Sequence, residues 1–230
     1  MEVRNLALLG KNISHSLSPE LYKEIYNDKK LNYQLIDIQS EASLPSLDVL
    51  MEKLDGLNIT SPYKEFYLNQ VEIDSTEVKS LKAINCIAKH NDRFKATNTD
   101  YIALKQLVPQ MSKNLNIIIL GDGVMSRVVS TVCTSLNIAY SIRSRKIDKK
   151  IFEEFSHGLI VDENSLLINC CSRSYCFNGR LGSNSHFWDL NYKHSEHQSY
   201  FLNSPSYTDG YSLLKLQAHE AAAFWSQLKN

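Results

Sequence analysis

The residue of this chain best suited to acid–base chemistry is Lys64, in the stretch Leu57-Asn58-Ile59-Thr60-Ser61-Pro62-Tyr63-Lys64. The alternating apolar residues at its start predict a short buried strand, and Pro62 suits the first position of a following helix. We therefore expect Thr60 and Lys64 at a turn from strand to helix, where open α/β sheets bind ligands. A lysine placed there can donate a proton to a ligand. The simpler alternative is an ordinary turn with a lysine in solvent.

Two further segments carry polar side chains beside a predicted helix start. In His15-Ser16-Leu17-Ser18-Pro19, Ser18 is a suitable N-cap with Pro19 at the first helical position. The free N–H groups of such a helix start attract anions. Asp100 follows a predicted hairpin, residues 86–89 and 93–96, and is expected to cap a helix. Capping alone would explain both Ser18 and Asp100.

A strand, a glycine turn and a helix follow one another in the second half of the chain. The segment Asn116 to Leu120 is apolar without a break after its first residue, and Gly121-Asp122-Gly123 follows it directly, before apolar residues at helical spacing. A dinucleotide-binding fingerprint requires this context. After a second predicted strand, residues 138–142, comes Arg143-Ser144-Arg145-Lys146, whose charges suit the 2′-phosphate of NADP. The alternative is a solvated basic loop.

Strands and helices are predicted to alternate along the whole chain. Strands at about 3–9, 33–38 and 57–59, with helices between them, predict an α/β fold with a mostly parallel sheet. We expect two α/β domains with a cleft between them. The first is residues 1–102, completed by a C-terminal helix, 211–230, that packs back on it. The second is a Rossmann-like domain, residues 103–210, whose last strand is expected near residues 187–192.

Composition excludes several classes of partner. The 230 residues carry 25 basic and 25 acidic side chains, so nucleic acid and anionic membranes are not expected partners. No apolar run approaches the roughly 20 residues that span a bilayer, and the N-terminus lacks a signal-peptide layout. Five cysteines without paired spacing favour reduced thiols and a cytoplasmic location. The oligomeric state, monomer or homodimer, stays open.

No metal site is predicted, although two segments invite the question. Cys170 and Cys171 are adjacent, and adjacent cysteines rarely chelate one zinc ion together. His194 and His197 have a helical spacing, but we find no further convincing ligand for them in the sequence.

Four motifs in the first half resemble the signatures of the shikimate dehydrogenase family. These signatures are a His-Ser-x-Ser-Pro turn, an Asn-x-Thr-x-Pro-x-Lys turn, a Gly-Ala-x-Asn-Thr segment and an Asn-Thr-Asp segment. This chain matches them, in that order and at about the family's spacing, at residues 15–19, 58–64, 83–85 and 98–100. In the third segment Lys82 and Cys86 replace the family's Gly and Thr. Near the C-terminus, Gln217-Ala218-x-x-Ala221-x-x-x-Trp225 extends the resemblance.

The resemblance implies NADPH-dependent, reversible reduction of 3-dehydroshikimate to shikimate, a step toward chorismate and the aromatic amino acids. Lys64 and Asp100 would hold the reacting C–O group, and Lys64 would protonate the forming alkoxide while hydride arrives from the nicotinamide. The residues implied to orient the substrate ring and its carboxylate are Ser16, Ser18, Thr60, Asn85, Tyr192 and Gln217. The residues implied to bind the cofactor are Gly121, Gly123, Val124, Ser144, Arg145, Lys146, Asn169 and Gly210.

The second half of the chain departs from the family pattern, most clearly in its glycine turn. Where relatives have Gly-Ala-Gly-Gly-Ala, this chain has Gly121-Asp122-Gly123-Val124-Met125, which adds a negative charge close to the expected pyrophosphate. Two alternatives follow. One is a binding protein that keeps the polyol-acid pocket but has lost nicotinamide binding. The other is a dehydrogenase for a related cyclic hydroxy acid, such as quinate or aminoshikimate, although two serines in the first turn suit shikimate better than quinate.

Overall fold

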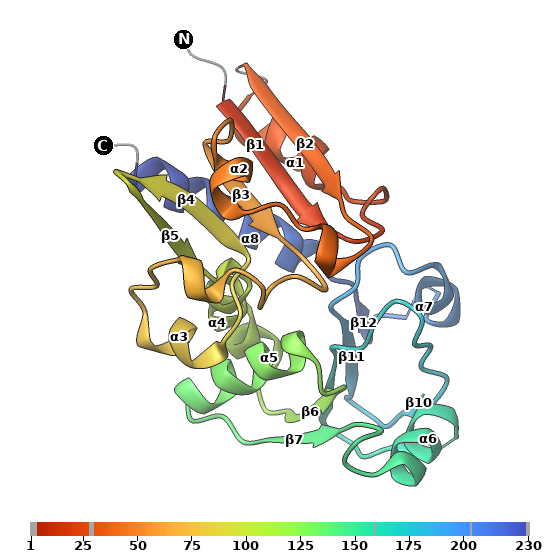
Figure 1. Cartoon of the computed structure of the whole chain (residues 1–230). Coiled ribbons are helices and arrows are strands. Elements are labelled where there is room, and N and C mark those ends of the chain that lie inside the picture. Colours follow the sequence, from red (N-terminus) through yellow and green to blue (C-terminus); the bar gives the residue numbers. More distant parts are fainter. Residues whose placement is uncertain (1–3, 28–29, 159, 203, 229–230) are drawn as a thin grey trace. The chain divides into compact units, whose positions relative to one another are not determined.

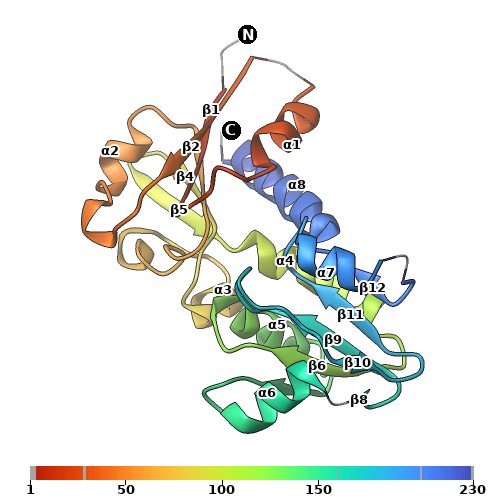
Figure 2. The same ribbon diagram turned by 90° about the vertical axis from the view of Figure 1, so that its right-hand side faces the viewer.

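The computed structural model describes residues 4–27, 30–158, 160–202 and 204–228 of the chain. The chain divides into two compact units, Met1–Ile102 with Lys215–Asn230 and Ala103–Leu214. Figure 1 and Figure 2 show that each unit has its own sheet with helices packed around it. Two helices, α4 (Thr99–Met111) and α8 (Tyr211–Gln227), contribute residues to both units.

The sheet of the first unit is mixed, with the strand order β2-β1-β3-β4-β5. Its parallel part consists of β1 (Arg4–Gly10), β2 (Leu31–Asp37) and β3 (Gly56–Ile59). The antiparallel part is the predicted hairpin, β4 (Cys86–His90) and β5 (Arg93–Thr97). The apolar residues of β1 and β3 are buried, as their sequence pattern predicts.

Helices cover this sheet, and the C-terminal helix closes its core. The first unit contains α1 (Ser18–Ile25), α2 (Leu47–Met51) and α3 (Thr76–Leu81), with short 3₁₀ helices at Glu41–Ser43 and Leu68–Gln70. Trp225 of α8 is buried and donates to the Ile87 carbonyl oxygen at 3.0 Å. A methyl group at Gly56 would lie 2.5 Å from the Trp225 ring, so only glycine allows this packing. The predicted packing of this helix on the first unit is confirmed.

The predicted helix after Pro62 is absent from the structure. Residues 61–67 form successive turns that lead into the 3₁₀ helix Leu68–Gln70, and the Ser61–Pro62 peptide bond is cis. The buried side chains of Tyr63 and Tyr67 donate to the carbonyl oxygens of Ile38 and Pro45, at 2.6 and 2.7 Å. These long-range bonds stabilise the turns in place of the local helix that the sequence favoured.

The sheet of the second unit is fully parallel. In the order β12-β11-β9-β6-β7, its strands are Tyr207–Thr208, His186–Asp189, Ser165–Asn169, Asn116–Leu120 and Tyr140–Arg143. The chain enters at β6, moves outward to β7 and returns to the other side of β6 at β9, which is a doubly wound arrangement with its switch point between β6 and β9. The strand predicted near residues 187–192 is present as β11, but it ends at Asp189, and it is not the last strand, because β12 follows it.

Three helices accompany this sheet: α5 (Val124–Ser135), α6 (Lys149–His157) and α7 (Ser195–Tyr200). A two-stranded sheet pairs β8 (Ile160–Val161) with β10 (Arg180–Leu181). Stacked aromatic rings, among them Phe177, Phe187 and Phe201, fill the core. The strand, glycine turn and helix predicted for residues 116–135 are all present.

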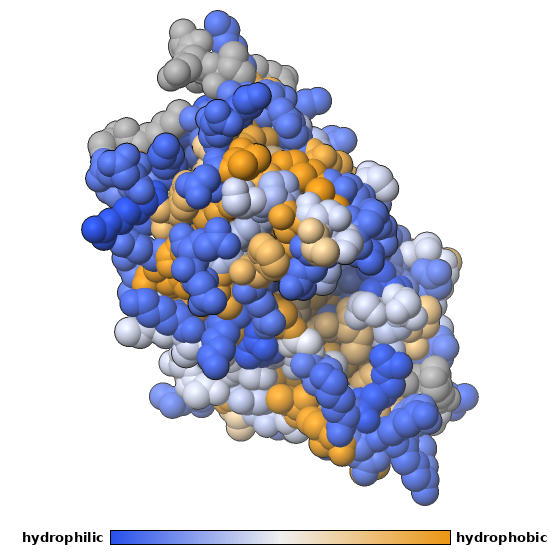
Figure 3. All heavy atoms as spheres, in the orientation of Figure 1, coloured by the Kyte–Doolittle hydropathy of each residue, from blue (hydrophilic) through white to orange (hydrophobic). Residues whose placement is uncertain are grey.

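Apolar residues reach the surface in places in both units, as Figure 3 shows in orange among hydrophilic side chains. Single exposed residues of this kind, such as Val49 and Ile147, are ordinary on protein surfaces. None of the helices in the described parts of the chain has both the length and the apolar character needed to cross a bilayer.

Candidate functional site

Lys64 and Asp100 form a buried ion pair in the first unit. The Lys64 Nζ lies 2.6 Å from Asp100 Oδ2, and each residue is only 8% exposed. Lys64 comes from the turns after β3, and Asp100 from the first turn of α4. In a low-dielectric surrounding each charge needs the other, since an unpaired buried charge costs several kcal/mol. The lysine is therefore not the solvated surface residue of the simpler alternative.

Asn98, and not Asp100, caps helix α4. The Asn98 Oδ1 accepts from the backbone N–H of Tyr101 at 3.0 Å, while its Nδ2 donates to the Ala83 carbonyl oxygen. The predicted capping role of Asp100 is therefore wrong. Because Asn98 satisfies the helix start, the Asp100 carboxylate is left for Lys64.

Asn85 and Gln217 meet at Thr99, the first residue of α4. Asn85 Oδ1 accepts from the Thr99 backbone N–H at 2.7 Å and lies 3.2 Å from its hydroxyl oxygen. The same hydroxyl lies 3.1 Å from Gln217 Oε1, on α8. Since the Ile84 N–H donates to the Lys64 carbonyl oxygen at 2.8 Å, the segment that carries Asn85 is also tied to the Lys64 turn. Three predicted site residues, Asn85, Gln217 and Lys64, are thus held through one hydrogen-bonded segment.

The predicted serine pair lies at the start of α1. Ser18 is the first residue of the helix, and its side chain makes no capping bond, so its prediction as N-cap is wrong. Instead Ser16 Oγ accepts from the Ser18 backbone N–H at 3.2 Å and donates to its hydroxyl oxygen at 3.1 Å. Thr60 follows β3, where its methyl group packs against Gly10 at the end of β1.

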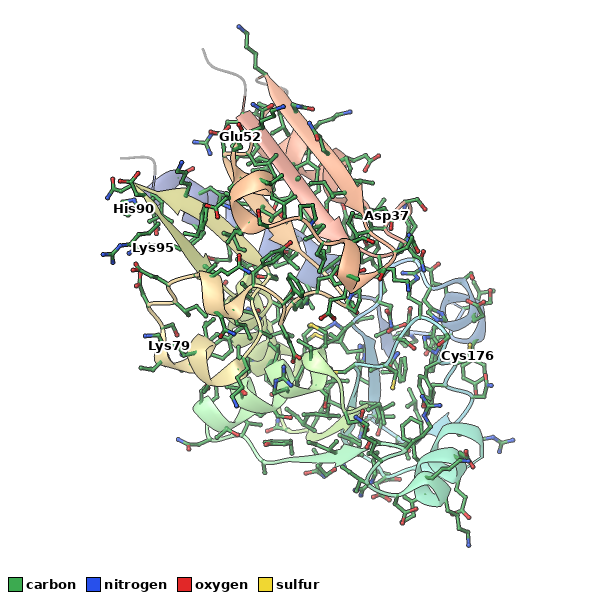
Figure 4. All side chains as sticks on the ribbon, viewed as in Figure 1. Asp37, Glu52, Lys79, His90, Lys95 and Cys176 are labelled. Carbon is green, nitrogen blue, oxygen red and sulfur yellow. The ribbon has the colours of Figure 1, made fainter. Side chains whose placement is uncertain are left out.

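Sequence reasoning missed the residue that holds the serine loop. The Asp37 carboxylate at the end of β2 (Figure 4) accepts from the backbone N–H groups of Asn12 at 2.8 Å and Ile13 at 3.1 Å. These residues precede the serine pair in the same loop. An acidic residue at the end of a strand is the only signal in the sequence, and it is weak, because such residues are common near loops.

Sequence reasoning also missed a buried cluster behind Asn85. Asn58 Oδ1 accepts from the hydroxyl groups of Tyr22 at 2.8 Å and Tyr33 at 3.1 Å, and Asn58 Nδ2 donates to the Asn85 carbonyl oxygen at 3.3 Å. The rings of Tyr22 and Tyr33 stack with centroids 4.7 Å apart. Burial, and after it the neighbouring Tyr33, raises the pKa of Tyr22 well above its usual value, so the phenol remains a donor at neutral pH.

The predicted cofactor turn lies at the switch point of the second unit. Gly121 has φ +105°, a backbone conformation that favours glycine. Gly123 is exposed and is the N-cap residue of α5, and Val124 is the first residue of that helix. An added methyl group at Gly123 would meet no described protein atom within 4 Å. The free N–H groups of the helix start, next to open space, fit a phosphate group.

The predicted 2′-phosphate residues follow β7. Ser144 is buried, and its hydroxyl accepts from the Ile147 N–H at 3.3 Å, so it shapes the turn. Arg145 and Lys146 are exposed. Lys146 Nζ lies 3.6 Å from the Asp122 carboxylate, which ties this basic turn to the glycine turn.

The remaining predicted residues of the second unit, Asn169, Gly210 and Tyr192, make contacts within the protein. Asn169 ends β9 fully buried, and its Nδ2 donates to Asp189 Oδ1 at 2.9 Å. Gly210 is packed so closely that an added methyl group would lie 2.2 Å from the Leu190 carbonyl oxygen. Tyr192 lies under the guanidinium of Arg173, 5.9 Å from the ring centre, and Arg173 also donates to the Tyr192 carbonyl oxygen.

Comparison with known proteins identifies the family of this chain. A family model described as the shikimate dehydrogenase substrate binding domain matches residues 8–87. Shikimate dehydrogenase of Sulfurisphaera tokodaii is 33% identical over 176 residues, which cover 74% of this chain and 65% of that protein. Shikimate dehydrogenase (NADP(+)) of Clostridium perfringens strain ATCC 13124 is 30% identical over 180 residues, covering 70% and 66%. The chain belongs to the shikimate dehydrogenase family.

Solved structures show the shikimate dehydrogenase fold for nearly the whole chain. Shikimate dehydrogenase 1 from Peptoclostridium difficile superimposes with a TM-score of 0.77 at 23% identity, covering 99% of this chain and 93% of that one. Shikimate 5-dehydrogenase from Thermus thermophilus, crystallised with NADP(H) and shikimate, gives 0.73 at 19% identity, covering 98% and 94%. The sequence alignments, in contrast, span 65% of the Sulfurisphaera tokodaii protein and 65% of a second relative, shikimate dehydrogenase (NADP(+)) of Saccharolobus solfataricus, which is 26% identical. The predicted family and α/β fold are confirmed.

Within this shikimate dehydrogenase fold, the second unit contains one His/Asp cluster that sequence reasoning misjudged. Asp189 joins His194 and His197, with ligand atoms within 4.8 Å of one another, so a third candidate metal ligand does exist. His197 Nδ1 lies 2.6 Å from Asp189 Oδ2, and His197 Nε2 accepts from the Phe177 N–H. His194 binds the Arg173 carbonyl oxygen and the His197 N–H. All four ring nitrogens are therefore engaged, and metal binding would break these bonds.

The thiols near the switch point are poor nucleophiles. Burial raises the pKa of Cys171 to about 12, partly opposed by Arg145 and reinforced by Asp122. Burial also raises the pKa of Cys170 well above its usual value. All five cysteines are free, as the sequence predicted. At neutral pH these two side chains are protonated and act as packing groups.

Proposed function

We propose that this chain is an NADP-dependent oxidoreductase that interconverts shikimate and 3-dehydroshikimate. The observation that carries this proposal is the buried Lys64–Asp100 ion pair, 2.6 Å long, in the unit that matches the family's substrate binding domain. The relatives from Saccharolobus solfataricus and Clostridium perfringens support the substrate and the cofactor, since both are shikimate dehydrogenases (NADP(+)). Because the alignments cover about two thirds of those relatives, the activity is a proposal for this chain.

The chemistry assigned to the first unit is proton transfer. In the reductive direction the carbonyl carbon gains a hydride, and its oxygen takes a proton from Lys64 Nζ, leaving a neutral amine that solvent protonates again. The bound nicotinamide supplies that hydride. Asp100 Oδ2 orients the ammonium group, and Asp100 Oδ1 has no partner among the described residues, so it can accept from a substrate hydroxyl. In the oxidative direction the same groups remove the proton.

The polar residues around this pair would orient the substrate. Ser16 and Ser18 lie at the start of α1, whose free N–H groups suit the substrate carboxylate. Asn85, Gln217 and Thr60 are assigned to the ring hydroxyls. Tyr192, which belongs to the second unit, is assigned to the substrate on the strength of the resemblance alone.

The second unit has the parts that a dinucleotide needs, with one opposing charge. The helix start at Gly123 suits the pyrophosphate, and exposed Arg145 and Lys146 suit the 2′-phosphate of NADP. Asp122 lies in the same turn and opposes both. This charge keeps a second function open, a binding protein that recognises the polyol acid without redox activity. A cytoplasmic location and a monomeric or homodimeric state belong to the proposal and remain predictions.

The test is a steady-state assay of the nicotinamide absorbance with shikimate or quinate as substrate and NADP or NAD as cofactor. We expect turnover with shikimate and NADP, a lower kcat/KM with NAD and a lower kcat/KM with quinate. Calorimetric binding of shikimate without turnover at any cofactor concentration would instead support the binding protein. Preferred turnover of quinate or aminoshikimate would move the activity to a related cyclic hydroxy acid.

A further inference from the structure

The side chain of Asn85 has a fixed orientation. A backbone N–H can only donate, so the Asn85 atom 2.7 Å from the Thr99 nitrogen must be the amide oxygen. The Thr99 hydroxyl lies 3.2 Å from the same oxygen and reinforces this assignment. The amide nitrogen Nδ2 must then point the other way, and it donates to no other group among the residues that the structure describes. Asn85 therefore offers a ligand donors only.

The backbone of Asn85 is fixed as firmly as its side chain. Its carbonyl oxygen accepts from the Ile59 N–H at 2.9 Å and from Asn58 Nδ2 at 3.3 Å. Because that carbonyl can only accept, the Asn58 amide is oriented too, with its oxygen toward the hydroxyl groups of Tyr22 and Tyr33. All of these atoms belong to the first unit, and Asn58, Asn85, Thr99 and Tyr22 are buried.

We propose that Thr99 and Asn58 are positioning residues that hold Asn85 as an obligate donor and thereby make the site select a hydroxyl over an amino group. A substrate hydroxyl facing Asn85 Nδ2 accepts one hydrogen bond and remains free to donate its own proton, for example to a carboxylate. An ammonium group at the same position has no lone pair to accept with and faces the amide hydrogens unfavourably. The identity of the ligand as shikimate rests on the proposed function.

The hydroxyl of Thr99 is the part of this device that can be removed most cleanly. It has one proton and two acceptors in reach, Asn85 Oδ1 at 3.2 Å and Gln217 Oε1 at 3.1 Å. Valine has the shape of threonine without the hydroxyl, whereas serine keeps it. Thr99→Val therefore removes the hydroxyl contact with both predicted substrate residues, and Thr99→Ser is the matched variant that keeps it.

The experiment compares kcat/KM for shikimate with kcat/KM for analogues in which the 4- or the 5-hydroxyl is replaced by an amino group. In the wild type we expect at least about a tenfold preference for shikimate over one of them, the size of one hydrogen bond. Thr99→Val should reduce this preference severalfold and raise KM for shikimate, with KM for NADP unchanged. Thr99→Ser should restore the wild-type preference. Asn58→Asp, which cannot donate to the Asn85 carbonyl, should also raise KM for shikimate alone.

The outcomes separate this inference from the proposed function. Turnover of shikimate with an unchanged preference in a folded Thr99→Val variant would overturn the inference and leave the dehydrogenase activity standing. If neither the wild type nor any variant turns over shikimate, calorimetric dissociation constants for shikimate and the two amino analogues replace kcat/KM. A preference for shikimate that Thr99→Val loses and Thr99→Ser keeps then supports the inference, although the dehydrogenase activity is absent. Equal affinities of the wild type for all three ligands would overturn the inference as well as the activity.

Discussion

Several buried polar side chains of the first unit converge on the segment around Asn85, whereas Asn169, Asp189, His194 and His197 of the second unit bond to one another and to nearby backbone groups. In the first unit, the atoms Asn85 Nδ2 and Asp100 Oδ1 have no hydrogen-bond partner among the described residues. In the second, Asp189 accepts from both Asn169 and Asn191 and lies 2.6 Å from His197. The first arrangement has capacity left for a ligand, whereas the bonds of Asp189 and the two histidines in the second are made within the protein.

Because of this difference, we expect salt to affect substrate binding and cofactor binding to different extents. Lys64, Asp100 and Asn85, which we propose to bind substrate in the first unit, are buried, and salt screens the interactions of buried groups poorly. The proposed cofactor binding in the second unit would depend on exposed Gly123, Arg145 and Lys146, opposed by Asp122. Exposed charges are screened and individually worth little. We therefore expect KM for NADP to rise with ionic strength much more than KM for shikimate.

The largest expected effect comes from removing the ammonium group of the first unit. Lys64→Met should lower kcat by about 10² to 10⁴, the usual contribution of a general acid or base. It should also lower the melting temperature, because Asp100 stays buried without its partner. Lys95→Met is the matched control, since Lys95 also pairs with a carboxylate, Asp74 at 3.1 Å, but is more exposed. A Lys64 variant with wild-type kcat would refute the assignment.

A pair of glycine substitutions distinguishes packing from cofactor contact in the second unit. Gly121→Ala should lower the free energy of unfolding by about 1–3 kcal/mol, because Gly121 has a positive φ and the methyl group would lie 3.2 Å from Cys171 Sγ. Gly123→Ala should leave stability unchanged but raise KM for NADP, since its methyl group would meet only a ligand. Urea denaturation and cofactor kinetics measure the two effects. An unchanged KM in the Gly123 variant would place the pyrophosphate elsewhere.

A smaller effect tests whether Asp122 weakens the cofactor site. Asp122→Asn removes a negative charge from the glycine turn and releases Lys146, so KM for NADP should fall by about fivefold, the order expected for one exposed charge. The gain should disappear in high salt. Glu163→Gln, another exposed acid of the same unit, serves as the control. A higher KM in the Asp122 variant would mean that the carboxylate assists binding.

The smallest effect is a pH dependence of stability from the second unit. Burial lowers the pKa of His186, whose Nε2 lies 2.8 Å from the Thr208 hydroxyl oxygen. The unfolded chain therefore binds a proton more readily, and stability should decrease as the pH falls below the usual His value of 6.5. His186→Gln should flatten this decrease in urea titrations, whereas exposed His219→Gln should not. Identical pH profiles for both variants would exclude His186 as the cause.

Local patterns in the sequence predicted most of the fold. The buried strands, the hairpin around Asn91 and the strand, glycine turn and helix at 116–135 have signals within a few residues, namely apolar periodicity and turn residues. The errors lie where distant residues decide. Tyr63 and Tyr67 hold the turns after β3 through carbonyl groups more than twenty residues away, so the predicted helix does not form.

The candidate site was predictable in its residues but not in its supports. The motifs that contain Lys64, Asp100 and Asn85 stand out in the sequence. Asn58 is held by tyrosines 36 and 25 residues away, and nothing local distinguishes those tyrosines from ordinary core residues. Asp189 and His197 likewise depend on a fold that brings a strand end and a helix together.

The most direct test of the account is a single turnover of NADPH with 3-dehydroshikimate, with the protein in excess and the cofactor concentration increased stepwise. This design bypasses a weak cofactor site, because hydride transfer is seen whenever the ternary complex forms. The account predicts one equivalent of NADPH oxidised by the wild type and a loss of at least about a hundredfold in rate in Asp100→Asn. No oxidation at any cofactor concentration, in protein that binds shikimate, would contradict it.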